Sequence, residues 1–170
     1  SLVGIVMGPY LANRFGKKKV YLTAVIISTA LNLLRLLDVT SMILIYISAL
    51  IGGVAGGWMV PVSTSIQADN TTYVQYKTGK RAEAAIASLT SFVSKVAQGL
   101  GGAIPGYVIA AYGFVTGASV QPESINTGII LCALILPLIF GILGSLIFGT
   151  QYTLDQKAVI EMDAKINRNN

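Results

Sequence analysis

The chain has 170 residues, of which 54% are hydrophobic and 11% charged, and this charged share is too small to cover the surface of a soluble domain. A single cysteine, Cys132, excludes a disulfide framework, and the lack of histidine excludes the His/Cys clusters that bind metals. The net charge of +5 would suit nucleic acid only if the basic residues shared one face, and their spacing argues against that. The composition therefore predicts a membrane-embedded protein.

Four segments are long and apolar enough to cross a bilayer as helices, which takes about 20 residues. In chain order they are residues 20–37, 41–66, 82–112 and 125–150. A fifth apolar segment, residues 1–12, is too short to span and lacks the basic leader of a signal peptide, so we expect it to continue an earlier helix. The predicted fold is all-α, a polytopic transmembrane helical bundle, and the chain is expected to be a piece of a larger membrane protein.

The basic residues divide between the predicted loops unevenly. Ten of the twelve lie in alternate loops or in the tail: Arg14, Lys17, Lys18, Lys19, Lys77, Lys80, Arg81, Lys157, Lys165 and Arg168. The second loop has no basic residue, and the fourth has only an acid, Glu123. This positive-inside pattern predicts that the first loop, the third loop and the tail are cytoplasmic. Arg35, an exception, lies within a turn of a helix end and is expected to extend to the outer headgroups.

Lys95 is the second exception, and it lies deep in the third predicted span. It is fourteen residues beyond Arg81, about 21 Å along a helix, which is too far for its side chain to return to the interface. Facing lipid, a lysine at this depth costs at least about 2.5–3.5 kcal/mol. Lys95 is therefore expected to face a cavity or a partner.

Lys95 belongs to one polar face of its predicted helix. Spacings of three and four relate Ser88, Ser91, Lys95, Gln98 and Gly102. Ser94 lies at the border of this face, and the opposite side is apolar. Hydroxyls and an amide beside a charge predict a water-filled pathway or a binding site. A lysine that only ties two helices together is the alternative.

Two stretches carry a resemblance to a known family. Residues 68–83, ADNTTYVQYKTGKRAE, resemble the cytoplasmic loop signature of the glycoside–pentoside–hexuronide:cation symporters, which are sugar permeases of the major facilitator superfamily similar to melibiose permease. The matching positions are Asp69, Tyr73, Tyr76, Lys77, Gly79, Arg81 and Glu83. Residues 9–19, PYLANRFGKKK, resemble the short cytoplasmic motif of the superfamily. The sequence departs from these motifs at three positions. Acids are usual at the positions of Thr72 and Asn13, and glutamate is frequent at the position of Gln75.

The resemblance implies the C-terminal half of a major facilitator fold. Residues 1–150 would run from the end of helix eight through helix twelve, and residues 151–170 would be a cytoplasmic tail. The implied function is cation-coupled sugar symport by alternating access in a multi-pass protein of a bacterial inner or plasma membrane. The expected partners are a sugar, the lipid bilayer, the missing N-terminal half and a monovalent cation (sodium, proton or lithium) whose site lies mainly outside this chain. No other cofactor and no nucleic acid are expected.

The resemblance also suggests roles for particular residues. Lys95 falls where relatives similar to melibiose permease carry a lysine, and we expect Lys95, Gln98, Ser91 and Ser94 to bind the sugar, with Lys95 also sensing the cation site. Trp58 is a candidate for stacking on the sugar, with ordinary packing as the alternative. The residues expected to gate the cytoplasmic side are Asp69, Arg81, Glu83, Tyr73 and Arg14.

The sequence contains no nucleophile–base pair, metal cluster or phosphate loop, so an enzyme is not expected. Two other functions stay open. A facilitator-type transporter of another solute, such as an organic anion, would use Lys95 as a counter-ion. A non-transporting helical scaffold or receptor would have no need for the polar face around Lys95.

Overall fold

The computed structural model describes residues 2–118 and 120–168. Within these residues the secondary structure is helical throughout, as the sequence predicts. The elements are α1 (Leu2–Phe15), α2 (Lys17–Leu37), α3 (Met42–Thr78), α4 (Glu83–Ala111), α5 (Ser124–Ile130), the π-helix η1 (Leu131–Ile135), α6 (Leu136–Gln151) and α7 (Gln156–Arg168).

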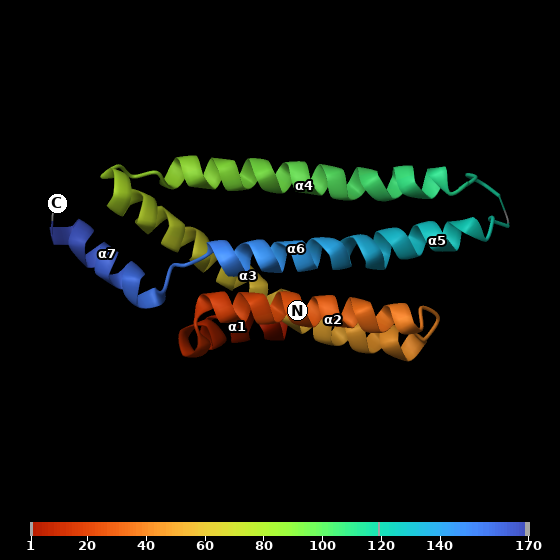
Figure 1. Ribbon diagram of the computed structural model, residues 1–170, viewed down its shortest axis with the longest axis horizontal. Helices are drawn as coiled ribbons and strands as arrows, with labels where there is room; N and C mark the ends of the chain where they lie inside the picture. Colours follow the sequence, from red (N-terminus) through yellow and green to blue (C-terminus); the bar gives the residue numbers. More distant parts are fainter. Residues whose placement is uncertain (1, 119, 169–170) are drawn as a thin grey trace.

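The long helices run side by side along one direction (Figure 1). α1 and α2 pack against α3, and α2 also packs against α6. α5, η1 and α6 form one continuous rod between this group and α4 (Figure 1). α7 follows α6 after a short connection and packs on the last part of α3 (Figure 1). The segment predicted to be a cytoplasmic tail therefore contains a helix that contacts the bundle.

α3 is longer than predicted. The predicted span ends at residue 66 and is followed by a loop, but the helix continues to Thr78 without interruption. Its 37 residues make it about 55 Å long, well beyond the bilayer core of about 30 Å, so its last turns project past the apolar region. It ends at Gly79, whose φ of 69° allows its N–H to donate to the carbonyl oxygen of Gln75. Most of the motif predicted as a loop is thus helical.

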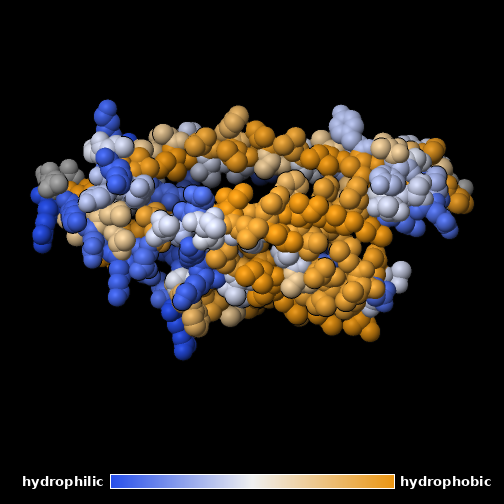
Figure 2. Space-filling view, viewed as in Figure 1, coloured by the Kyte–Doolittle hydropathy of each residue, from blue (hydrophilic) through white to orange (hydrophobic). Residues whose placement is uncertain are grey.

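Three segments are long and apolar enough to cross a membrane by length and composition: Lys17–Leu37, Met42–Thr78 and Ser124–Gln151. α4 has 29 residues and is also long enough, but it is not among them, because serines, Lys95, Gln98 and glycines lower its mean hydropathy. An apolar band lies across the middle of the molecule, with polar side chains at both ends (Figure 2). We call the end that carries Lys17–Lys19, Lys77–Arg81 and α7 the basic end.

Close packing of α1 on α3 depends on residues without bulky side chains. Gly4, Gly8 and Ala12 are buried and four residues apart, so they form one stripe. A Cβ at Gly8 would lie 3.0 Å from the carbonyl oxygen of Trp58, and one at Gly4 would collide with the carbonyl oxygen of Val54. The two backbones therefore touch, as small residues permit in membrane helices.

The π-helix η1 interrupts the last span. The N–H of Leu136 donates to the carbonyl oxygen of Leu131, five residues back, which widens the turn. Pro137 follows in the first turn of α6 and has no N–H to donate, which removes one α-helical hydrogen bond at the same place. Such π-turns inside α-helices are rare and are frequent at functional sites.

Candidate functional site

A buried ion pair joins two helices at the basic end. The ammonium of Lys17 lies 2.7 Å from each carboxylate oxygen of Asp69. Asp69 is 6% exposed, and among the described residues it is the one charged residue that is buried. A buried carboxylate without a partner would be costly, so the contact with Lys17 compensates the burial of Asp69. The pair connects the first turn of α2 with the part of α3 that projects beyond the predicted span.

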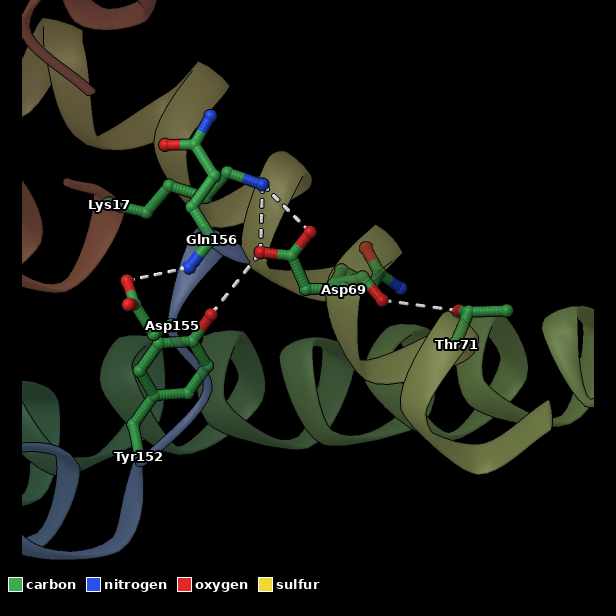
Figure 3. A network of polar contacts seen from close by, with 7 residues as sticks. Lys17, Asp69, Thr71, Tyr152, Asp155 and Gln156 are labelled. Atoms are coloured by element: carbon green, nitrogen blue, oxygen red, sulfur yellow. Dashed lines mark hydrogen bonds and ion pairs between the residues drawn. The ribbon is translucent and has the colours of Figure 1, made fainter. Parts of the chain in front are cut away.

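Tyr152 adds a third helix to this contact. Its hydroxyl donates to a carboxylate oxygen of Asp69 at 3.3 Å, just beyond the end of α6 (Figure 3). Burial, the negative charge of Asp69 and this hydrogen bond raise the pKa of Tyr152 above its ordinary value of 10.0. The phenol therefore stays protonated and acts as a donor. We call Lys17, Asp69 and Tyr152 the basic-end cluster.

Aromatic packing holds Tyr152 in place. Its ring stacks on Phe148 at a centroid distance of 4.9 Å, and Phe148 contacts Tyr21 of α2 at 4.6 Å. Tyr152 also belongs to the apolar core, together with Val62 and Ile66 of α3. The hydroxyl is thus aimed at Asp69 by a ring that cannot swing away without disturbing this core.

The basic-end cluster lines a cavity of about 200 Å³. Lys18 and Lys19 contribute to its wall, as do the residues that connect α6 to α7, including Asp155. The cavity is open and holds charges of both signs.

Two other predicted gating residues line a different cavity. Arg81 and Glu83 lie where α3 gives way to α4, and with Asp163 of α7 and Gln75 of α3 they enclose about 460 Å³. Asp69 is absent from this cavity and Arg81 from the first. The structure therefore places Asp69 and Arg81, two of the predicted gating residues, in different cavities.

The remaining predicted gating residues are peripheral. Tyr73 is 38% exposed, and the ammonium of Lys77 lies 5.9 Å from the centre of its ring. Arg14 is exposed, with its guanidinium 5.5 Å from the ring centre of Phe15. Within the described residues, no side-chain hydrogen bond or ion pair links either residue to the basic-end cluster, and their gating roles stay predictions.

The polar face of α4 is uncovered. Lys95, Gln98, Ser91 and Ser94 are all exposed, and no residue of α4 is buried. Lys95 forms no ion pair within residues 2–118 and 120–168. The apolar side of the helix is exposed as well, with Phe92 at 67%. The roles of the four polar residues in binding stay predictions, because the described residues supply no second wall to the predicted pathway.

Trp58 packs against the core cluster between α1 and α3. Its ring N–H is buried and has no hydrogen-bond partner among the described residues. The packing alternative describes what Trp58 does within this chain, and stacking on a sugar stays a prediction.

Sequence reasoning missed Lys17 and Tyr152. The run GKKK was used for topology and as part of the short cytoplasmic motif, but no partner was predicted for Lys17. One buried acid on α3 needs a basic partner, and this run is the densest source of basic residues. For Tyr152 the signal is weaker: it is the first residue after the last apolar segment, and nothing in its neighbours points to Asp69.

Comparison with known proteins gives one family match, to the family described as MFS/sugar transport protein, over residues 1–156. The glucuronide carrier protein homolog of Escherichia coli is 30% identical over 96% of this chain, and an uncharacterized symporter of Bacillus subtilis is 32% identical over 96%. The isoprimeverose transporter of Lactiplantibacillus pentosus is 27% identical over 74% of the chain. No solved structure gives a significant match.

The matches cover only part of each relative. They span 37% of the glucuronide carrier homolog, 36% of the symporter and 27% of the isoprimeverose transporter. The chain thus spans about a third of the length of these curated relatives.

Proposed function

Because the chain belongs to the MFS/sugar transport protein family, we propose that it forms part of a cation-coupled sugar symporter that works by alternating access. The polar face of α4 is the observation that carries this proposal. Its serines, Gln98 and Lys95 lie on a helix long enough to cross a bilayer, and no described helix covers them. Inside a membrane such a face must lie against polar groups or a water-filled cavity, because exposing a lysine to lipid is costly in free energy.

Family membership and three membrane-capable segments make the chain part of a multi-pass membrane protein. The reported relatives are bacterial and are named as carriers, symporters or transporters. The proposed location is accordingly the inner or plasma membrane of a bacterium.

In the proposed transporter, α4 forms one wall of a site near the middle of the membrane. A second set of helices, outside this chain, forms the other wall, and the two rock about the bound solute. Lys95 and Gln98 would donate hydrogen bonds to sugar hydroxyls, and Ser91 and Ser94 would donate or accept them.

The basic-end cluster is the proposed brace of the gate. Lys17, Asp69 and Tyr152 tie α2, α3 and α6 together, so these helices move as one body when the transporter rocks. Arg81 and Glu83 lie in the neighbouring cavity, next to the start of α4, and are the proposed contacts for the other half of the protein.

Coupling to a cation supplies the energy for uphill transport. One monovalent cation moving down the membrane potential supplies about 2.3 kcal/mol per 100 mV. The proposed cation is sodium, a proton or lithium, and its site lies mainly outside this chain. Lys95 would respond electrostatically to occupancy of that site.

A second candidate function is transport of an anionic sugar derivative or another organic anion. Lys95 favours this second function, because it is a positive charge in the middle of α4 and forms no ion pair in the described structure. The similarity to a glucuronide carrier protein homolog also favours it, because a glucuronide carries a carboxylate. In this case Lys95 is a counter-ion rather than a donor to hydroxyls.

The test uses the complete transporter in vesicles with an imposed cation gradient. Lys95→Ala and Lys95→Met should both abolish accumulation of the transported sugar, while Lys80→Met, which removes an exposed loop lysine, should not. Met keeps most of the stem volume, so loss in both variants identifies the charge. Expression and solute binding are measured separately from uptake.

A Lys95→Met variant that accumulates sugar normally would make Lys95 structural and remove the main support for the proposal. Competition separates the two candidates. Excess neutral glycoside should block uptake if the solute is a sugar, whereas only the corresponding uronate should block it if the solute is an anion.

A further inference from the structure

A polar cleft lies between α2 and α3 at the end of the molecule opposite the basic end. It has a volume of about 190 Å³. Its polar lining comes from Ser28, Asn32 and Arg35 of α2 and from Ser48 of α3, and Gly52 leaves room at its inner end. None of these residues belongs to the proposed transport site or to the basic-end cluster.

The cleft is built into the register of both helices. Ser28, Asn32 and Arg35 recur at spacings of four and three, so they share one face of α2. Ser48 and Gly52 are four apart on α3 and meet that face. Polar side chains within membrane helices usually face a partner, and here four of them converge on one space.

Arg35 has no acidic partner within residues 2–118 and 120–168. The acid nearest to it in sequence is Asp38, whose Oδ1 accepts hydrogen bonds from the backbone N–H groups of Thr40 and Ser41. That carboxylate is therefore used to shape the loop between α2 and α3. The half-buried guanidinium, with five N–H donors, remains without a counter-charge.

Depth along α2 places the cleft at a membrane surface. Arg35 is eighteen residues from Lys17, or about 27 Å along the helix, close to the thickness of a bilayer core. With Lys17 at one interface, Arg35 lies at the other. Ser28 is seven residues closer to Lys17, about 10 Å deeper in the membrane. The charge is thus at the rim, with the amide and the hydroxyls below it.

This order matches the order of groups in a phospholipid. The phosphodiester is outermost, the glycerol esters lie beneath it, and the acyl chains follow. A guanidinium binds a phosphate with two parallel hydrogen bonds, and Asn and Ser side chains can donate to ester carbonyls. We propose that the cleft between α2 and α3 binds the headgroup of a phospholipid from the leaflet opposite the basic end, with Arg35 on the phosphate.

The test measures lipid binding by the complete, delipidated transporter in detergent. Phosphatidylglycerol should raise its thermal unfolding temperature, whereas diacylglycerol, which lacks the phosphate, should not. Arg35→Gln should weaken phosphatidylglycerol binding by about tenfold or more, because a charge-assisted bidentate contact is lost. The affinity of Arg35→Lys for phosphatidylglycerol should lie between those of the parent and Arg35→Gln. Lysine keeps the positive charge but cannot form the two parallel hydrogen bonds of a guanidinium.

A second variant keeps the charge and removes the space. The Ser48 hydroxyl donates to the carbonyl oxygen of Ile45 in its own helix, so Ser48→Leu fills the cleft without breaking a contact between helices. It should reduce lipid binding as Arg35→Gln does. Lys80→Gln, which removes a basic residue at the other end, should bind phosphatidylglycerol like the parent.

Two results would overturn the proposal. The first is equal stabilisation of the parent and Arg35→Gln by phosphatidylglycerol; if the variant is then also less stable without lipid, Arg35 is assigned to a carboxylate of another protein segment. The second is an equal effect of inorganic phosphate, which would make the occupant a free anion. Since the measurement is binding rather than uptake, its failure would leave the proposed transport function untouched.

Discussion

Asp69 shows what a buried charge demands of its neighbours. The sequence predicted it as a gating residue but did not identify Lys17 as its partner. Arg81, another predicted gating residue, lines a different cavity. The continuation of α3 to Thr78 carries the chain nine further residues, about 14 Å, away from Asp69 before Arg81 begins. The partner of Asp69 is instead Lys17, 52 residues away in sequence, which the packing of α2 on α3 brings beside it.

The first prediction concerns the ion pair. Lys17→Met should destabilise the complete transporter by about 3–5 kcal/mol, because it leaves the buried Asp69 carboxylate without its cation. The double variant with Asp69→Asn should recover much of this loss, since no uncompensated charge remains. Denaturant or thermal unfolding of the purified proteins measures both.

Lys19→Met is the matched control, because Lys19 is exposed in the same helical turn. It should change stability by less than about 1 kcal/mol. A Lys17→Met protein as stable as Lys19→Met would show that the ion pair does not stabilise the fold.

At the scale of elements, hydropathy predicts the spans to within a few residues at most ends. α2, α4 and the rod α5–η1–α6 all lie close to the predicted segments. The extension of α3 was missed because its residues are polar, and polarity was interpreted as a loop. Residues 62–78 contain no glycine or proline, however, and that favours continuation of the helix. The π-turn of η1 has no signal of its own in the sequence beyond Pro137.

The second prediction tests the contact between α1 and α3. Gly4→Ala should lower the stability or the folded yield of the transporter, because the added methyl would collide with the carbonyl oxygen of Val54 and separate the helices. Gly53→Ala is the control, since a Cβ there has no atom within 4 Å. Alanine favours a helix over glycine by about 1 kcal/mol, so the control should be neutral or stabilising.

Fluorescence-detected gel filtration after heating compares the two variants. Equal melting temperatures for Gly4→Ala and Gly53→Ala would contradict the close approach of the two backbones.

For the whole molecule, composition and hydropathy are enough to predict an all-α membrane bundle, and the family match over residues 1–156 confirms the resemblance seen in two short motifs. The binding site could not be completed from this chain. α4 offers a polar face that nothing described covers, and the chain spans about a third of its relatives. One helix can identify a wall of the proposed site. The volume and the selectivity of that site depend on the helices that face this wall.

The third prediction concerns orientation in the membrane. The basic end should face the cytoplasm, because the ten basic residues of the positive-inside pattern lie there, most of them at the ends of α1, α2 and α3 and on α7. In a Cys132→Ser background, single cysteines in place of Lys80 and Thr116, both exposed in loops, should react with a membrane-impermeant thiol reagent from opposite sides. Labelling of both positions in intact cells would contradict this orientation.

The π-turn has a consequence for the far end of its rod. A π-turn accommodates one residue more than an α-turn, so η1 acts as a one-residue insertion that sets the rotational phase of everything after it. If the same residues formed only regular α-turns, α6 would be rotated by about 100° about its axis. Phase is transmitted along a helix without loss, so Phe148 would turn away from Tyr21, and the hydroxyl of Tyr152 would turn away from Asp69. A single extra residue near the middle of the bilayer therefore determines whether the Tyr152 hydroxyl reaches the buried Asp69 carboxylate at one membrane surface.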